Sequence, residues 1–128
     1  MASHTAVVLI AHGSPDPDWH APIDRLVEQL RQRLTSITVS VAYLGFSQPP
    51  LAEAVAQLHA EGHRDVLVLA AFLSPGGKHI KRDVPALVTE VGAAHPDLRL
   101  SLRPGALGAE PEVVEAPAVV AARATVES

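Results

Sequence analysis

Residues 5–17 have the sequence TAVVLIAHGSPDP, in which an apolar run stops abruptly at a histidine, a glycine and two prolines. Residues 5–11 are almost all apolar, which is typical of a parallel strand that helices cover on both faces. Gly13, Ser14 and Pro15 then turn the chain sharply and leave His12 at the rim. The stretch therefore predicts a buried strand that ends where a binding site begins.

Outward from this strand, the chain alternates apolar runs with amphipathic stretches. Strands are expected at residues 5–11, 37–44, 65–73 and 98–102, and the alternating pattern of the second strand favours a position near an edge. The expected helices cover residues 18–34 and 49–61, a segment from near Asp83 with Pro85 in its first turn, and, more weakly, the tail, where Pro117 should kink the helix.

Four strand–helix units predict the architecture. We expect one α/β domain over residues 1–128, with a doubly wound four-stranded parallel sheet of order 2-1-3-4 and helices on both faces. In this order the crevice that binds ligands lies between the carboxyl ends of the first and third strands.

The composition excludes several classes of protein. The chain has 128 residues, of which 48% are hydrophobic and 19% charged, so it is globular rather than disordered. A net charge of −4 without a basic cluster argues against nucleic-acid binding, and no stretch is long enough to span a membrane. Because cysteine is absent, any metal must take nitrogen or oxygen ligands. A cytoplasmic protein without an organic cofactor is expected.

Two loops open into the predicted crevice, one after each of its two strands. The first loop carries His12, and the second, residues 74–83, carries His79 between glycines and basic residues. Neutral imidazole binds divalent cobalt, nickel, iron or zinc, and it exchanges protons near neutral pH. A lone histidine at a strand end is more often structural, but the pairing of two such loops favours a metal site at His12 and His79.

The remaining candidates have competing interpretations. Lys78, Lys81 and Arg82 form either a clamp for the carboxylates of an acidic ligand or a solvated loop. His20 is expected at the surface rather than over the site. Trp19 either packs the first helix or covers a flat ligand.

Four further histidines lie away from the predicted crevice. His59 and His63 have the spacing of a helical metal pair, but Gly62 should end the helix between them, which favours cations at a helix C-terminus. His4 and His95 are expected to be solvated.

Three segments together resemble a known family, the small CbiX-type sirohydrochlorin chelatases. They are VVLIAHGSPDP near the start, LAAFLSPGGKHIKRDVPAL in the middle and LRPGALG late in the chain, and the resemblance extends to about residue 115. It implies a half-length class II chelatase fold that works as a homodimer. It also implies insertion of cobalt, nickel or ferrous iron, as substrate, into sirohydrochlorin during the synthesis of cobalamin, coenzyme F430 or siroheme.

The resemblance assigns roles to individual residues. The two metal-binding histidines of the family fall on His12 and His79, and a neutral imidazole there would also accept a pyrrole proton. Sirohydrochlorin carries many carboxylates, and its expected contacts are Gly13, Ser14, Ser74, Gly76, Gly77, Lys78, Lys81 and Arg82.

The chain departs from the family at two acidic positions. Where the family commonly has L-E-F-A-E-P, residues 44–49 are LGFSQP, with Gly45 and Gln48 in place of the acids. A later His-Pro is replaced by Glu110 and Pro111. Either the chain is an altered chelatase in which Glu110 or Asp16 supplies the carboxylate, or it is a non-catalytic carrier of metal or tetrapyrrole. A purely structural interaction protein would leave the two histidine loops unexplained.

Overall fold

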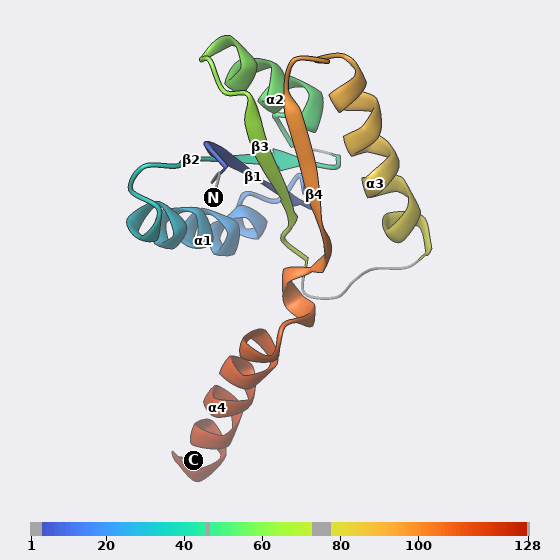
Figure 1. Ribbon diagram of the computed structural model, residues 1–128. Coiled ribbons are helices and arrows are strands. Elements are labelled where there is room, and N and C mark those ends of the chain that lie inside the picture. Colours follow the sequence, from blue (N-terminus) through green and yellow to red (C-terminus); the bar gives the residue numbers. More distant parts are fainter. Residues whose placement is uncertain (1–3, 46, 73–77, 128) are drawn as a thin grey trace.

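The computed structural model describes residues 4–45, 47–72 and 78–127. Its centre is a sheet of four parallel strands in the order β2-β1-β3-β4 (Figure 1), formed by β1 (Ala6–Ala11), β2 (Thr38–Tyr43), β3 (Asp65–Ala70) and β4 (Arg99–Ala106). The predicted fold class and strand order are therefore confirmed, and β2 is an edge strand as expected.

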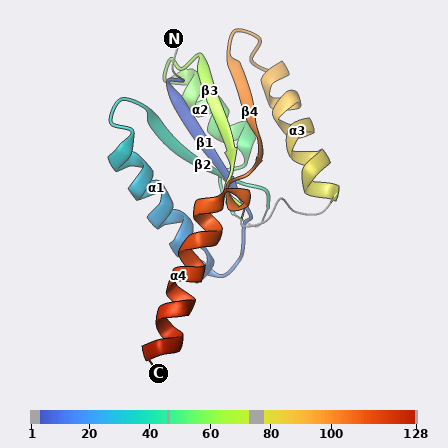
Figure 2. The ribbon, with the colours of Figure 1, turned by 60° about the horizontal axis from the view of Figure 1, so that its bottom comes forward.

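Helices cover both faces of this sheet (Figures 1 and 2). A short 3-10 helix, η1 (Pro17–His20), leads into α1 (Ala21–Arg33) on one face, whereas α2 (Leu51–Ala60) and α3 (Lys78–Ala93) cover the other. Alternate residues of β1 serve the two layers, because successive side chains of a strand point to opposite faces. Val8 and Ile10 join the core beneath α2 and α3, while Leu9 packs against Val27 of α1.

The two faces are covered unequally. On the side of α2 and α3, Val66 and Val68 of β3 are fully buried, whereas Leu67 and Leu69 on the opposite side are only half-buried. The fully buried residues of the α1 layer come from β1, β2 and α1 itself. The β3 half of this face is therefore left with partly exposed apolar residues.

The third helix begins earlier than its sequence suggested. It starts at Lys78 rather than near Asp83, so His79 lies in its first turn and Pro85 lies in its interior. Proline at that position removes one helical hydrogen bond. Val84 and Val88 are nevertheless buried in the core, and this packing holds the helix together through the proline.

The last two strands also differ from expectation in length. β3 ends at Ala70, and β4 continues to Ala106 instead of stopping at residue 102. The register shifts between them, since Val68 pairs with Leu102 but Ala70 pairs with Ala106. Gly105, at φ +82°, accommodates this irregularity in a conformation that other residues rarely adopt.

The C-terminal helix projects away from the rest of the molecule. A 3-10 turn, η2 (Leu107–Ala109), joins β4 to α4 (Pro111–Glu127), which extends beyond the carboxyl edge of the sheet (Figures 1 and 2). The helix continues through Pro117 and exposes 65% of Val114 and more than half of Val119 and Val120. In the part of the chain that the structure describes, no helix is both long and apolar enough to cross a membrane.

Candidate metal centre

His12 lies directly after β1, at the carboxyl edge of the sheet. Its ring packs on that of Phe72, with 4.5 Å between ring centroids, and Phe72 follows β3. Among the described residues the ring nitrogens of His12 have no hydrogen-bond partner, although Trp19 donates its indole N–H to the His12 backbone carbonyl. His12 is thus exposed between the ends of β1 and β3, with both nitrogens open to a ligand.

The second predicted metal ligand is only partly described. The backbone of His79 lies in the first turn of α3, downstream of Phe72. The side chains of His79 and Lys78 lie outside the described part, as do residues 73–77, which include the predicted contacts Ser74, Gly76 and Gly77. No set of three or more possible metal ligands occurs among the described side chains. The pairing of His12 with His79 therefore remains a prediction.

Gly13 has a tight backbone neighbour. A Cβ atom at position 13 would lie 1.4 Å from the carbonyl oxygen of Gly45, which itself accepts a hydrogen bond from the Ser47 N–H at 2.7 Å. A Cβ at position 45 would meet nothing within 4 Å, and Gly45 does not have a positive φ. Gly13 is required where two loops meet, whereas position 45 has room for a side chain.

His20 is the residue that sequence reasoning placed wrongly. It was expected at the surface, but its half-buried ring stacks on Tyr43 at a centroid distance of 4.9 Å. Its Nε2 lies 2.8 Å from Ser47 Oγ, which also accepts from the Ser14 N–H at 3.1 Å and donates to the Ser14 carbonyl at 3.2 Å. Sequence spacing could not reveal this cluster because its members come from different loops.

Burial also affects Tyr43. It raises the pKa of the phenol above its usual range, and the negative charge of Asp24 raises it further. Tyr43 is therefore a neutral surface for the His20 ring at physiological pH. Trp19 is 54% exposed and is not part of the core, so a role in covering a ligand and a role in packing the first helix both stay open.

Basic residues near the start of α3 have different surroundings. Lys81 lines a cavity of about 280 Å³ between α3 and the last two strands, next to Phe72. Arg103 of β4 lies on the same cavity and was not predicted. Arg82 is exposed and pairs with the adjacent Asp83 at 3.4 Å, so it is solvated as one alternative expected, although it lies in α3 and not in a loop. The other residues of the cavity wall are Ala70, Val84, Pro85, Leu102, Gly105 and Ala106.

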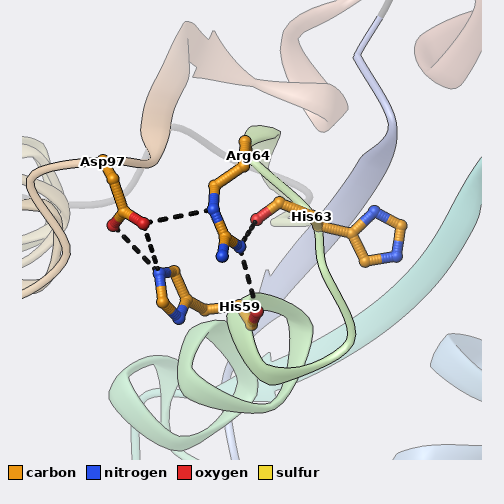
Figure 3. Close-up of polar contacts among 4 residues, drawn as sticks. All are labelled: His59, His63, Arg64 and Asp97. Carbon is orange, nitrogen blue, oxygen red and sulfur yellow. Dashed lines mark hydrogen bonds and ion pairs between the residues drawn. The ribbon is translucent and has the colours of Figure 1, made fainter.

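Histidines at the opposite edge of the sheet are bound to other side chains (Figure 3). His59 contacts both carboxylate oxygens of Asp97 at 2.9 and 3.1 Å, and Arg64 reaches the same carboxylate at 3.2 Å. The hydrogen bond from His59 is the main reason that the pKa of Asp97 lies below its usual range. His63 points away from His59 and bonds Thr5 at 2.9 Å, so these two histidines do not form a metal pair.

His4 and His95 have partners as well. His4 binds Asp65 at 2.7 Å, and the His95 ring lies 4.7 Å from that of His59, so neither is simply solvated as expected.

Comparison with known proteins decides the family. The family model CbiX matches residues 6–124. The chain belongs to the CbiX family. Two similar curated proteins are named sirohydrochlorin cobaltochelatase. The protein from Methanococcus aeolicus is 26% identical over 65% of this chain and 57% of its own length. The protein from Saccharolobus solfataricus is 34% identical over 64% of this chain and 62% of its own. The chain thus spans about three fifths of these relatives.

Solved structures agree with the CbiX assignment. A protein described as a cobalamin (vitamin B12) biosynthesis CbiX protein, from Marinobacter aquaeolei, superimposes with a TM-score of 0.84 and 26% identity over 96% of this chain and 98% of that one. SirB from Bacillus subtilis, solved with Fe³⁺, has a TM-score of 0.68 and 18% identity over 78% of this chain and 39% of its own. The latter likeness supports the fold alone.

The two acids expected to replace the missing CbiX-family carboxylates both have structural partners. The Glu110 carboxylate accepts a hydrogen bond from the Arg103 guanidinium. Asp16 caps η1 by accepting the backbone N–H of Asp18 at 3.0 Å. Each carboxylate thus has a structural role, and a role of either as proton acceptor beside His12 stays a prediction.

Proposed function

We propose that this CbiX-family chain inserts a divalent metal ion into sirohydrochlorin, with His12 and His79 as the metal ligands. The single feature that supports the proposal best is His12, which the fold holds at the carboxyl end of β1 with no described partner for its nitrogens. A histidine with a purely structural role would instead be buried or hydrogen-bonded to a neighbouring residue. The names of the relatives supply the substrate.

Metal insertion requires ligand exchange and the removal of two pyrrole protons. Neutral imidazoles at His12 and His79 hold the incoming ion through nitrogen, a donor that suits cobalt, nickel and ferrous iron alike. As the ring nitrogens replace the imidazoles, a histidine released from the metal accepts a proton. Cobalt is the first choice of metal because the relatives are named cobaltochelatases, and nickel and iron are the alternatives.

Recognition of the substrate depends on its carboxylates. Lys81 beside the cavity supplies a positive charge, and Ser14 offers its hydroxyl, since its backbone N–H is donated to Ser47. Gly13 and the segment with Ser74, Gly76, Gly77 and Lys78 bring backbone N–H groups and a further cation. Arg82 adds charge from the solvent side. No organic cofactor takes part, and the cytoplasm is the proposed compartment.

A homodimer completes the site in this proposal. The cavity of about 280 Å³ is close to the lower end of the range of about 300–1,000 Å³ that is usual for ligand pockets, and a second copy would extend its walls around a tetrapyrrole. Two apolar surfaces of the described part are also only partly covered, namely α4 and the side of β3 that carries Leu67 and Leu69. In a two-fold dimer each copy supplies both surfaces to the other.

The dimensions and charges of the two surfaces agree. α4 has 17 residues, about 25 Å of helix, and strands of six to eight residues are about 20–27 Å long. Glu112 and Glu115 of α4 would meet Arg99 of β4, which is exposed and lies 4.0 Å from Asp65 in its own chain. Most helical stability in proteins comes from packing, and Pro117 weakens α4 further, which gives this helix a reason to dock on a second copy.

Light scattering tests the dimer with full-length variants. The native chain should be a dimer at micromolar concentration, and Val120→Glu on α4 should be a monomer. The matched control Ala56→Glu, on the exposed side of α2, should stay dimeric. A monomeric native chain would contradict the proposed assembly.

A carrier of metal or tetrapyrrole is the second candidate function. It is favoured by Gly45 and Gln48, which remove two carboxylates that the family commonly has near the site. A carrier would bind Co²⁺ and sirohydrochlorin without joining them.

One assay separates the two functions. Sirohydrochlorin and Co²⁺ are mixed with the native chain, and metallation is followed by absorbance against the uncatalysed rate, with Ni²⁺ and Fe²⁺ in parallel. A chelatase accelerates metallation and loses this activity in His12→Ala but not in His59→Ala. Binding of both ligands by calorimetry without acceleration would leave the carrier as the function.

A further inference from the structure

The His20–Ser47 cluster at the carboxyl edge has no part in the mechanism above. Ser47 lies two residues after Gly45, on the loop where the family carboxylates are missing. His20 reaches this loop from the other side, at the end of η1. The cluster therefore adds a group able to accept protons to the wall that lost its acids.

The hydrogen bonds of Ser47 indicate which nitrogen of the neutral His20 ring carries the proton. The Ser47 hydroxyl has one proton, and donating it to the Ser14 carbonyl leaves Oγ to accept from the Ser14 N–H and from His20 Nε2–H. All three contacts are then satisfied at once. The proton sits on Nε2, and Nδ1 is the basic nitrogen. Within the described residues nothing bonds Nδ1, and stacking on Tyr43 fixes the plane of the ring.

His20 is also connected to the loop of His12. Trp19, its neighbour in sequence, donates to the His12 carbonyl at 3.2 Å, and Ser47 binds the backbone of Ser14, two residues beyond His12. The titratable groups around it are Tyr43, which stays neutral, Asp24 on α1, and Asp16 and Asp18 around the start of η1.

We infer that His20 is a proton acceptor of metal insertion, with Nδ1 taking one of the two pyrrole protons while Ser47 holds the ring in its Nε2–H form. This inference rests on the proposed chelatase function. The divalent ion replaces two protons on the ring nitrogens, one of them becomes the second proton of a His20 imidazolium, and the half-exposed ring then releases it to solvent. Ser47 is a positioning residue, because it acts through His20.

A glutamine at position 20 separates proton transfer from positioning. The Gln amide reaches the place of Nε2 and keeps a donor for Ser47 but has no basic nitrogen, so a merely structural His20 would be replaced well by His20→Gln. Because His20 accepts a proton in this proposal, kcat of the variant should fall by about 10²-fold or more. Its Co²⁺ affinity, measured by calorimetry, should be unchanged. The acid side of the pH–rate profile should change as well, although His12 and His79 still contribute to it. His63→Gln, at the other edge of the sheet, is the matched control and should behave as the native chain.

A substitution at position 45 should restore the activity that the change at position 20 removes. A side chain there has open space, so Gly45→Glu added to His20→Gln should restore a carboxylate base and recover much of the lost rate. Native kcat and an unchanged pH profile in His20→Gln would overturn the inference. A native chain that binds Co²⁺ but does not accelerate metallation would overturn the proposed function, and the role of His20 with it.

The tautomer is measured on the metal-free chain, apart from any activity. Long-range ¹H–¹⁵N NMR should show His20 as the Nε2–H form in the native protein and a mixture of forms in Ser47→Ala. A native Nδ1–H form would contradict the assignment even if the chain is a chelatase.

Discussion

The two edges of the sheet use histidine in opposite ways. At the amino edge, His4, His59 and His63 each bond an aspartate or a threonine hydroxyl. At the carboxyl edge, His12 touches an aromatic ring and leaves both nitrogens without a described partner. Because paired side chains are already satisfied, the amino edge contributes to stability, while the carboxyl edge keeps groups that a ligand can satisfy.

His20 lies between these two cases. One nitrogen is bonded, as at the amino edge, and the other is open, as in His12. An orienting hydrogen bond on one nitrogen defines which atom of the ring reacts. The hydrogen-bond partners of a histidine therefore indicate its role better than its position in the sequence does.

Replacing one histidine at each edge of the sheet should give the largest difference in Co²⁺ affinity. His12→Ala should weaken Co²⁺ binding by more than about 100-fold, since even the loss of a group that merely orients a metal ligand costs about 10–100-fold. His59→Ala should bind Co²⁺ as the native chain does. Calorimetry measures both, and equal affinities would show that the contrast between the edges has no functional meaning.

Two glycines at the carboxyl edge form the next comparison. Gly13→Ala should destabilise the chain by about 1–3 kcal/mol, because its Cβ would overlap the Gly45 carbonyl oxygen and push the two loops apart. Gly45→Ala should keep the native free energy of unfolding. Urea unfolding measures both variants. A stable Gly13→Ala would mean that the loops separate without cost.

Restoring a carboxylate should have a moderate effect in the native background. Gly45→Glu alone should raise the initial rate of sirohydrochlorin metallation by less than about tenfold, because His20 already supplies a base. Gly45→Gln, of the same shape, should not raise it. A gain of about 10²-fold or more in Gly45→Glu would mean that the native chain lacks a proton acceptor.

The smallest effect is expected at the amino edge, from Asp97→Asn. The pKa of Asp97 is lowered in the folded chain, so its carboxylate stabilises the fold above the ordinary aspartate range and loses this effect as the pH falls through the folded value. The variant should therefore have a slightly lower Tm than the native chain at pH 7. The difference should vanish well below about pH 4.

Glu90→Gln, an exposed change on α3, is the control for this pH dependence. It should not show a Tm difference that closes in acid. A constant Tm difference for Asp97→Asn between pH 7 and pH 3 would contradict an ionic contribution from Asp97.

The sequence by itself determined the strands, their order and the placement of His12 at a strand end. These features follow from apolar periodicity and from the handedness of parallel crossovers, and both act within a short stretch of chain. Strand and helix limits were less well determined. α3 begins five residues before Asp83, because burial of Val84 and Val88 outweighs the cost of Pro85 inside the helix.

Only the tertiary structure decided which loops meet. His20 and Ser47 are 27 residues apart, and Gly13 meets Gly45 across two loops whose sequences contain no sign of the contact. Such contacts depend on how β1 and β2 align, since Ala11 pairs with Tyr43 and thereby sets where each loop leaves the sheet. Local patterns specify which residues are buried in a strand, whereas the register between strands specifies which side chains meet beyond its end.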